Sequence, residues 1–258
     1  MKFIVITDCH VVPDGRTAHD LDPGARLRQA ITDINRLHAD ATGCIFLGDL
    51  TEDGTVGSYA YLKEIVSGLA IPTHFALGNH DDRSAFRAVF GTAPFDVNGF
   101  VQSVIDDADV RLIILDSLDQ GVHSGRLCAN RLEWLEFRLS ERPDTPVTIF
   151  LHHHPCAIDM AVDEVMLKDA DEFRAVLARH ANVAHVFSGH THRTCSGLWG
   201  RIPFATLGPT HYVTTHHFRD SDYPVERTAE TASFAILTIE TDRVLVHSHH
   251  FLATRIVA

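Results

Sequence analysis

Short β-branched runs alternate with amphipathic segments over the first two-thirds of the chain. The run FIVIT at 3–7 is followed by apolar residues at helical spacing over 27–37, and then by the apolar run 44–47. Helices that cover a buried sheet produce this alternation, so it predicts an α/β fold. The expected strands lie at 3–7, 44–47, 73–77, 100–105, 110–115, 147–151 and 184–187, and the expected helices at 27–37, 55–68, 83–90, 132–139 and 170–180.

The pattern changes after Gly200. Strand-like runs at 202–207, 233–240 and 243–249 suggest a second sheet packed against the first. Between them, 208–231 is polar and rich in Thr, His and Asp, and a connection of that length is usually a functional loop or an oligomer contact. The length of 258 residues suits one domain, so we expect a single domain over 1–258 in which 208–231 serves as a cap or oligomer contact.

Charge and cysteine content narrow the class of protein. The chain has a net charge of −12, so we expect no nucleic-acid surface and no binding to anionic membranes, both of which need clustered Lys and Arg. Five scattered cysteines without a CxxC pair favour a reduced, cytoplasmic protein. No apolar stretch approaches the roughly 18 to 20 residues that span a bilayer.

Five short polar motifs each follow a predicted strand. They are Asp8-Cys9-His10, Gly48-Asp49, Gly78-Asn79-His80-Asp81, His152-His153-His154-Pro155 and Gly189-His190-Thr191-His192. Ligands of open α/β sheets bind in the crevice at the carboxyl ends of the strands, so we expect these motifs to converge there. The 19 histidines of the chain also favour metal binding. The sequence therefore predicts a metal site.

The ligand types indicate which metals fit. Carboxylate, imidazole and one amide oxygen, without a required thiolate, suit Mn, Fe, Zn or Co and argue against a cysteine-bound structural zinc. Seven candidate ligands exceed the need of one tetrahedral ion. They would serve two divalent ions about 3.5–4 Å apart that share a bridging carboxylate.

Each motif also has an ordinary structural interpretation. Gly48-Asp49 alone is more often a turn, and GNHD could be a turn with Asn in a left-handed conformation. His190 and His192 would lie on one face of an extended segment, which favours metal binding. Five such motifs in this order are hard to explain as turns. Several other histidines, His123 among them, are expected to be structural, whereas His19, His216 and His217 are candidates for lining a substrate cleft.

The five motifs, in this order, resemble the calcineurin-like metallophosphoesterases over most of the chain. The GNHD and HHHP blocks, and GHTH followed by Gly208-Pro209-Thr210-His211, are similar to class III cyclic nucleotide phosphodiesterases and related glycerophosphodiesterases. The resemblance implies a four-layer α-β-β-α sandwich with a dinuclear metal site at one edge.

The resemblance also implies a role for each matching residue. Asp8, His10 and His192 would hold one ion, Asn79, His152 and His190 the other, and Asp49 would bridge them. His80 would contact the phosphate or protonate the leaving oxygen, and Asp81 would orient the imidazole of His80. His211 matches a histidine that reaches the substrate phosphate.

Two positions leave alternatives open. In the triple histidine the ligand is placed at His152, but a shift to His153 is compatible with the spacing; His153 and His154 could instead hold a ligand or a nearby carbonyl in place. Cys9 stands where Ser or Thr is common in these enzymes. In an extended strand its side chain would point away from Asp8 and His10, so we interpret it as a core residue.

The expected function is hydrolysis of small phosphodiesters, such as cyclic nucleotides or glycerophosphodiesters, by in-line attack of a metal-bound hydroxide. Protein phosphatases of this superfamily carry GDxxDRG, whose arginine helps to clamp a dianionic phosphate. Here 48–54 reads GDLTEDG without Arg, which favours a singly charged diester. The alternatives are a phosphomonoesterase or nuclease with the same site, or a non-catalytic scaffold. A homo-oligomer is also expected.

Overall fold

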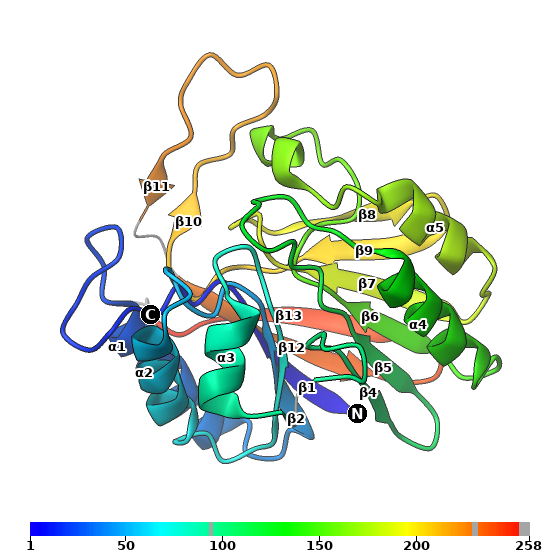
Figure 1. The fold of residues 1–258 in the computed structure, drawn as a ribbon, viewed down its shortest axis with the longest axis horizontal. Coiled ribbons are helices and arrows are strands. Elements are labelled where there is room, and N and C mark those ends of the chain that lie inside the picture. Colours follow the sequence, from blue (N-terminus) through cyan, green and yellow to red (C-terminus); the bar gives the residue numbers. More distant parts are fainter. Residues whose placement is uncertain (93–94, 229–231, 253–258) are drawn as a thin grey trace, which may run out of the picture.

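A five-stranded sheet forms the first half of the core. Its strand order is β13-β12-β1-β2-β3 (Figure 1). The computed structural model describes residues 1–92, 95–228 and 232–252. In this sheet β1, β2 and β3 run parallel, whereas β12 and β13 pair antiparallel at one edge. The strands are β1 (Lys2–Ile6), β2 (Gly43–Leu47), β3 (Thr73–Ala76), β12 (Ser233–Ile239) and β13 (Val244–His250).

A second sheet of six strands has the order β4-β5-β6-β7-β9-β8. Its four central strands, β5, β6, β7 and β9, run parallel, and the two edge strands pair antiparallel with their neighbours. The strands are β4 (Ser103–Asp106), β5 (Arg111–Ile114), β6 (Val147–Phe150), β7 (Val183–Ser188), β8 (Cys195–Trp199) and β9 (Ile202–Thr206).

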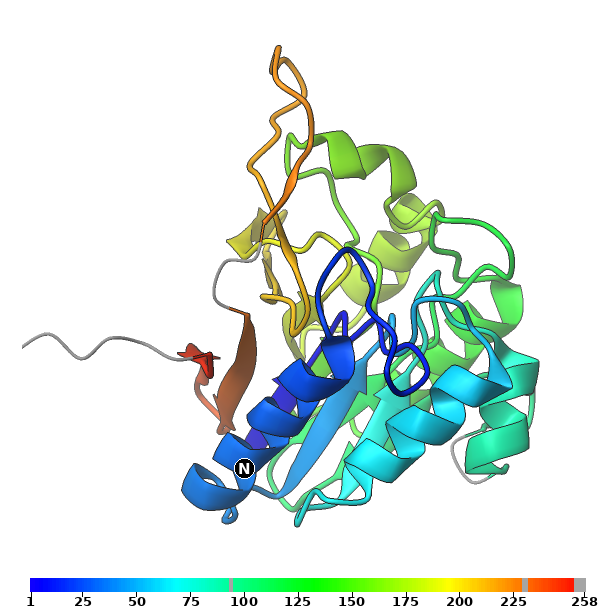
Figure 2. The ribbon, with the colours of Figure 1, turned by 90° about the vertical axis from the view of Figure 1, so that its left-hand side faces the viewer.

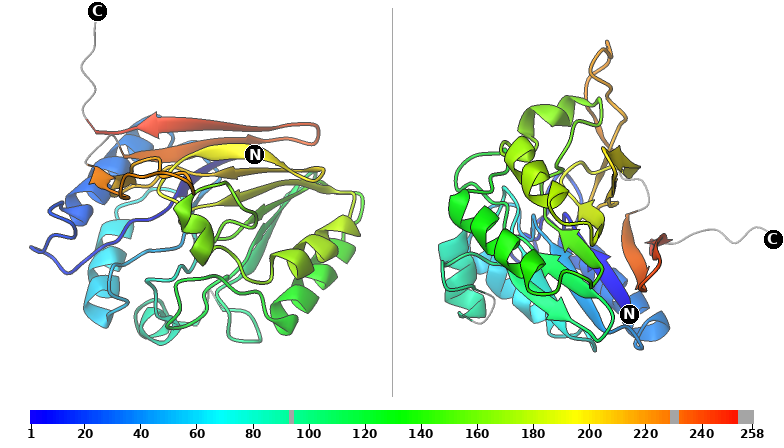
Figure 3. Two further views of the ribbon diagram at one scale, coloured as in Figure 1. Left: turned by 90° about the horizontal axis from the view of Figure 1, so that it is seen from above. Right: turned by 90° about the vertical axis from the view of Figure 1, so that its right-hand side faces the viewer.

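Helices cover the outer faces of both sheets. Figure 1 shows α1 (Pro23–Leu37), α2 (Val56–Val66) and α3 (Arg83–Phe90) on one side and α4 (Ala129–Ser140) and α5 (Ala170–Ala178) on the other, and Figure 3 shows the same layers from two further directions. The first three helices begin at capping side chains, because Asp22, Thr55 and Asp82 each accept a backbone N–H of the first turn.

Side-chain alternation in β1 explains why the molecule has four layers. Ile4 and Ile6 pack against the helices, whereas Phe3 and Val5 face the second sheet. The second sheet is covered in turn by apolar residues of α4 and α5, such as Leu135. A strand stretch buried on both faces must be apolar at every position, as residues 3–6 of β1 are. The predicted α-β-β-α sandwich is therefore confirmed.

The order of the strands corrects one expectation. The late runs do not build a second sheet: β12 and β13 complete the first sheet beside β1, and β9 joins the second sheet beside β7. The strand β8 was not predicted, because its sequence CSGLW lacks a continuous apolar run and three of its five residues are exposed. Periodicity finds a strand, but the choice of neighbouring strand depends on contacts distant in sequence. The other predicted elements match within a few residues.

The excursion at 208–231 carries a small hairpin. Two-residue strands β10 (Val213–Thr214) and β11 (Arg227–Thr228) pair antiparallel, and the hairpin projects from the sandwich in Figures 1 and 2. The last residues of this excursion, 229–231, lie outside the described part of the chain. No helix among the described residues is both long and apolar enough to cross a membrane.

Candidate metal centre

The five motifs meet at one edge of the sandwich, where the carboxyl ends of strands from both sheets converge. Asp8, Asp49 and Asn79 follow β1, β2 and β3 of the first sheet, and His152 and His190 follow β6 and β7 of the second. The predicted convergence is therefore confirmed, with the addition that two sheets contribute. The site lies between them, because each sheet alone supplies only part of the set.

The backbone at this edge is strained. Five of the predicted metal ligands have positive φ angles between 46° and 68°: Asp8, His10, Asp49, His190 and His192. Non-glycine residues seldom adopt this left-handed conformation, and where they do, it often marks a functional site. In the motifs, the left-handed turns bring the side chains together at the strand ends.

Two glycines permit the close approach of these loops. A Cβ atom at Gly78 would overlap the Oδ1 atom of Asp49, and one at Gly189 would overlap the Oγ1 atom of Thr7 and lie 2.9 Å from Oδ2 of Asp8. Any side chain at either position would displace a carboxylate or its neighbour. The GNHD and GHTH motifs therefore need glycine at these two positions, because no larger residue fits.

Four side chains form the first cluster: Asp8, His10, Asp49 and His192 offer ligand atoms within 4.8 Å of one another, and all four are buried. The Nε2 atoms of His10 and His192 are 3.1 Å apart. The Nδ1 atom of His10 donates to Glu52, and that of His192 donates to the carbonyl of Tyr212. With Nδ1 as the donor in both rings, Nε2 is the nitrogen that can bind a metal, and the two Nε2 atoms face each other beside two carboxylates, an arrangement that a shared cation would stabilise.

The second cluster contains buried polar atoms without a hydrogen-bond partner. Among the described residues, these include Oδ1 of Asn79, Nε2 of His152 and Nε2 of His190. The Nδ1 atom of His152 donates to the carbonyl of Leu47 at 2.9 Å, so Nε2 is the nitrogen that can bind a metal, and it lies 3.3 Å from Oδ2 of Asp49. An unsatisfied buried polar atom costs about 1–3 kcal/mol, and a bound cation would remove that cost for all three. These residues therefore fit a metal.

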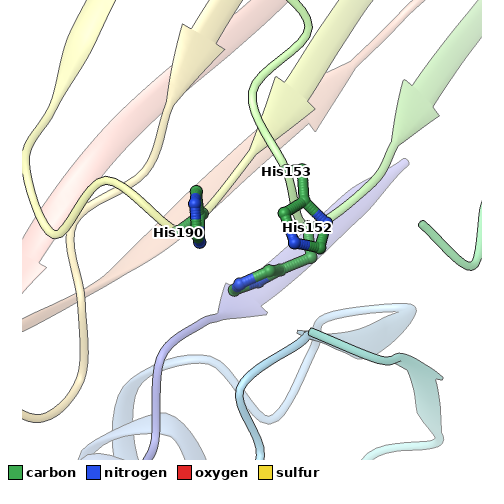
Figure 4. Close-up of side chains that lie close together, drawn as sticks. All are labelled: His152, His153 and His190. Carbon is green, nitrogen blue, oxygen red and sulfur yellow. The ribbon is translucent and has the colours of Figure 1, made fainter. Parts of the chain in front are cut away.

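His153 is also close to His152 and His190, as Figure 4 shows, but both of its ring nitrogens are occupied. Its Nδ1 atom accepts from the hydroxyl of Ser117 at 2.8 Å, and its Nε2 atom donates to the carbonyl of His123 at 3.2 Å. No lone pair of this imidazole is left for a metal. The geometry therefore favours His152 as the ligand over the one-residue shift.

The third histidine of the block, His154, contacts a neighbouring segment that lines the pocket. Nε2 of His154 lies 3.2 Å from Oδ1 of Asp163, which also accepts the backbone N–H of Ile158. Asp163 belongs to the short 3-10 helix η1 (Ala161–Val165), which lines the pocket above the clusters. His153 thus holds a nearby carbonyl, as one of the open alternatives suggested, whereas the contact of His154 with a carboxylate of η1 was not predicted.

Burial and charge act in opposite directions on the pKa values of the site. Burial lowers the pKa of His152, but the nearby carboxylates, chiefly Asp49, outweigh it and raise the pKa to about 9. Burial lowers the pKa of His192 to about 4 and lowers that of His190 well below its usual value. The buried carboxylates thus attract positive charge, and the neutral imidazoles can act as metal ligands.

The spacing argument for His190 and His192 was wrong, although both lie at the site. Their left-handed backbone breaks the extended geometry, and the two imidazoles enter different clusters. Cys9 is buried in the core that faces the helices, as expected, but Asp8 and His10 on either side of it are also left-handed and not part of a strand. Its burial therefore comes from the loop and not from strand alternation.

The structure contradicts the expected role of Asp81. One of its oxygens accepts the hydroxyl of Tyr59 at 2.8 Å, and the other accepts the backbone N–H groups of Leu50 and Gly78. Asp81 therefore joins the GNHD turn to the loop after β2. The imidazole of His80 is instead oriented by a backbone group, because its Nδ1 atom donates to the carbonyl of Glu52 at 2.9 Å.

His211 and His19 lie beside the first cluster and outside the pocket lining. The imidazole of His211 is fully buried, and its Nε2 atom donates to the carbonyl of Ala18 at 3.0 Å. Burial lowers the pKa of His211 to about 3. Nε2 of His19 lies 3.3 Å from Glu52. The described geometry therefore does not bring either imidazole to the open pocket.

A pocket of about 440 Å³ opens above the two clusters. Asp49, Asn79, His190 and His192 form its floor together with His80. One wall is apolar, and the β10–β11 hairpin forms another. The wall residues are Met160, Val162 and Val165 of the η1 region, and Tyr212, Thr214, His217, Val225 and Arg227 of the excursion.

Several of these residues were missed or assigned differently from the sequence. Arg227 and Tyr212 received no role, and His123, expected to be structural, lines the pocket. His217 lines it as one of the proposed cleft residues. Glu52 received no role of its own, because its contact with His10 joins two loops that are distant in sequence. A two-residue strand such as the one that holds Arg227 leaves no periodic pattern, so only the folded hairpin places this residue.

The sandwich and its convergent Asp, His and Asn side chains define a metallophosphoesterase-type protein. The family model for calcineurin-like phosphoesterases matches residues 1–194. A protein of Rhodopseudomonas palustris named "probable cyclic nucleotide phosphodiesterase" is 37% identical over 98% of this chain and 93% of its own length. The chain belongs to the calcineurin-like phosphoesterase family, as the sequence motifs predicted.

Two further comparisons agree with this membership. A "probable glycerophosphodiester phosphodiesterase" of Arcobacter nitrofigilis is 33% identical, with 86% of this chain and 83% of that protein covered. The crystal structure of a dimetal phosphatase from Danio rerio superposes with a TM-score of 0.74 at 16% identity, over 97% of this chain and 96% of the other. This last similarity shows the shared fold. Members of the family use divalent metals, and the clusters offer a place for them.

Proposed function

We propose that this protein is a dinuclear metal-dependent phosphodiesterase that hydrolyses small phosphodiesters, such as cyclic nucleotides or glycerophosphodiesters. The observation that carries the proposal is the set of three buried, unpartnered ligand atoms on Asn79, His152 and His190, next to the cluster around Asp8. The names of the two curated relatives support the choice of a diester.

The proposed ligand sets follow the two clusters. Asp8, His10 and His192 would hold one ion, and Asn79, His152 and His190 would hold the other. Asp49 would serve both, since its Oδ2 atom lies 3.7 Å from Nε2 of His10 and 3.3 Å from Nε2 of His152. When bound, two divalent ions polarise phosphoryl oxygens and lower the pKa of water. The metal is expected to be Mn, Fe, Zn or Co.

His80 is the proposed acid. It lines the pocket, and its Nδ1 atom already donates to the carbonyl of Glu52, so Nε2 is the nitrogen left for substrate. In its protonated form that nitrogen can donate to a phosphoryl oxygen or to the departing alkoxide. Because His80 lies next to Asn79, the turn after β3 positions both the proposed acid and the proposed metal ligand.

The charges around the pocket favour a diester over a monoester. The loop 48–54 carries acidic residues and no Arg. Among the described lining residues, Arg227 carries the only fixed positive charge, and it extends from the hairpin and not from the floor. A dianionic monoester therefore lacks a fixed clamp beside the metals. The apolar wall around Val162 suits the substituent of a diester.

The decisive experiment compares bis(p-nitrophenyl) phosphate with p-nitrophenyl phosphate, using protein whose metal content is known from elemental analysis. We expect faster turnover of the diester and loss of activity on chelation. A panel of 2′,3′- and 3′,5′-cyclic nucleotides and glycerophosphodiesters then identifies the substrate. A faster monoester reaction would support a phosphomonoesterase, cleavage of DNA a nuclease, and no turnover by metal-loaded protein a scaffold.

The proposal includes two features of the whole chain. Residues 1–258 act as one domain, and the projecting hairpin around 208–231 serves as a cap or as the contact of a homo-oligomer. Exposed Phe218, Tyr223 and Val225 on this excursion support an interface, because they are 48–52% exposed. Light scattering of the wild type, compared with a Phe218→Ser/Tyr223→Ser variant, tests the oligomer: a monomeric wild type would exclude it.

A further inference from the structure

Glu52 lies beside the first cluster because the loops after β1 and β2 stay paired beyond the sheet. The backbone N–H of His10 donates to the carbonyl of Asp49 at 3.0 Å, and that of Val11 donates to Leu50 at 3.1 Å. The N–H of Glu52 then donates back to Val11 at 3.1 Å. The pairing fixes the backbone of Glu52 close to that of His10. The carboxylate of Glu52 therefore lies within hydrogen-bond distance of the His10 imidazole.

Three histidines from two loops contact this one residue: His10 and His19 from the loop between β1 and α1, and His80 from the turn after β3. Oε2 of Glu52 accepts the Nδ1 proton of His10 at 2.6 Å, and Oε1 lies 3.3 Å from Nε2 of His19. The backbone carbonyl of Glu52 accepts the Nδ1 proton of His80 at 2.9 Å. The carboxylate is one-quarter exposed, so it is partly shielded from water and its interactions are strengthened.

We propose that Glu52 is a positioning residue that sets the ring orientation and the tautomer of His10 and couples the first metal position to His80. With its proton held on Nδ1 by Glu52, His10 must present the Nε2 lone pair to the cluster. A carboxylate that accepts from the far nitrogen of a metal-binding histidine also makes the ligand nitrogen more basic. This inference rests on the proposed function, because it assumes that Nε2 of His10 binds an ion.

The carboxylate is needed for two separate reasons. A neutral amide at position 52 could still accept the Nδ1 proton and keep the tautomer, but it would not polarise the imidazole as a charge does. A methyl group would do neither, and it would release His19 as well. Glu52→Gln and Glu52→Ala therefore separate orientation from charge, and the Gln variant should be the milder of the two.

The test measures metal binding and the tautomer, not only activity. Zn²⁺ affinities of the wild type and both variants are determined by competition with a chelator, and ¹⁵N spectra of the imidazoles report which nitrogen of His10 is protonated. Glu64→Ala is the matched control, because Glu64 also carries a negative charge and pairs with Arg28, but it is an exposed residue on α2. Thermal unfolding of each variant verifies the fold.

We expect Glu52→Ala to weaken the affinity of one of the two Zn²⁺ sites by about 10- to 100-fold. The ¹⁵N spectrum of this variant should no longer show His10 protonated at Nδ1 alone. Glu52→Gln should keep that signal with a smaller loss of affinity, and Glu64→Ala should behave as the wild type. Wild-type affinity and an unchanged His10 signal in both variants would overturn the inference. If the wild type itself binds no pair of ions, the proposed function fails instead, so the two failures are distinguishable.

Discussion

His190 and His192 are separated by one residue, yet their imidazoles belong to different clusters. Both have left-handed φ angles, at 68° and 52°, so the alternation of an extended chain does not apply to them. The sequence identified both residues because GHTH is a recognisable motif. It could not divide them between clusters from spacing, because the direction of each side chain depends on a strained backbone that only the surrounding loops stabilise.

The unpartnered buried atoms lead to a prediction for single ligands. Replacing Asn79 with Ala removes one of the three orphaned atoms of the second cluster and should eliminate one bound ion. We expect diester hydrolysis to fall by at least about 100-fold, since loss of a residue that merely supports a ligand already costs about 10- to 100-fold. Metal content per chain and turnover are the measurements. His247→Gln, on exposed β13, is the control; an Asn79→Ala variant with two ions would contradict the assignment.

The close approach at Gly189 leads to a second prediction. A Cβ atom there would overlap Oγ1 of Thr7, so Gly189→Ala should destabilise the protein by about 1–3 kcal/mol and displace Asp8 from its position. Urea unfolding gives the free energy. Gly57→Ala is the matched control, because its Cβ would meet nothing closer than 3.8 Å and would lie within α2, where Ala is favoured. Equal stability of both variants would show that the loop adapts at no cost.

At the scale of elements, the helices and most strands were predictable because their apolar periodicity is local. The helix over 83–90 was predicted with the bounds that the structure shows, since Asp82 caps it and Gly91 ends it. The pairing of β12 with β1 was not predictable, because these strands are more than two hundred residues apart in the chain. The same holds for the hairpin of β10 and β11, which is too short to have a period.

The hairpin places Arg227 at the pocket, with its guanidinium 5.2 Å from the centre of the Tyr212 ring. Tyr212 in turn stacks on His192 at 4.1 Å. Arg227→Ala should raise KM for an anionic diester about three- to tenfold and change kcat little, because an exposed charge contributes about 1 kcal/mol of binding. Steady-state kinetics measure KM and kcat of this variant. The control variant is Arg243→Ala, because Arg243 is an arginine that pairs with Glu240. An unchanged KM would place the hairpin outside the substrate site.

At the scale of the whole molecule, the metal centre joins the two sheets. Asp8, Asp49 and Asn79 come from one sheet, and His152 and His190 from the other, so cations bound between them would oppose separation of the layers. Without cations, the buried carboxylates are balanced only by the neighbouring imidazoles. Metal binding and folding should therefore be linked.

This linkage predicts a shift in thermal stability. An ion present at one hundred times its dissociation constant stabilises the folded state by about 2.7 kcal/mol, so two ions contribute about twice that. A domain of this size gains about 2–4 °C per kcal/mol, which gives a rise in Tm of about 10–20 °C on metal loading. Calorimetry with and without a chelator measures it. Asn79→Ala should retain about half of the shift; a full shift would argue against two sites.

The sequence by itself determined the fold class, the helices, most strands and the five motifs, because periodicity and strand-end chemistry are local properties of the chain. Only the tertiary structure decided which sheet each late strand joins, that left-handed turns and not strand alternation direct His190 and His192, and that Asp81 supports backbone groups and not His80. It also decided that Glu52 contacts His10 and that Arg227 reaches the pocket. These facts depend on contacts between segments far apart in sequence and on left-handed backbone conformations, neither of which leaves a periodic signal.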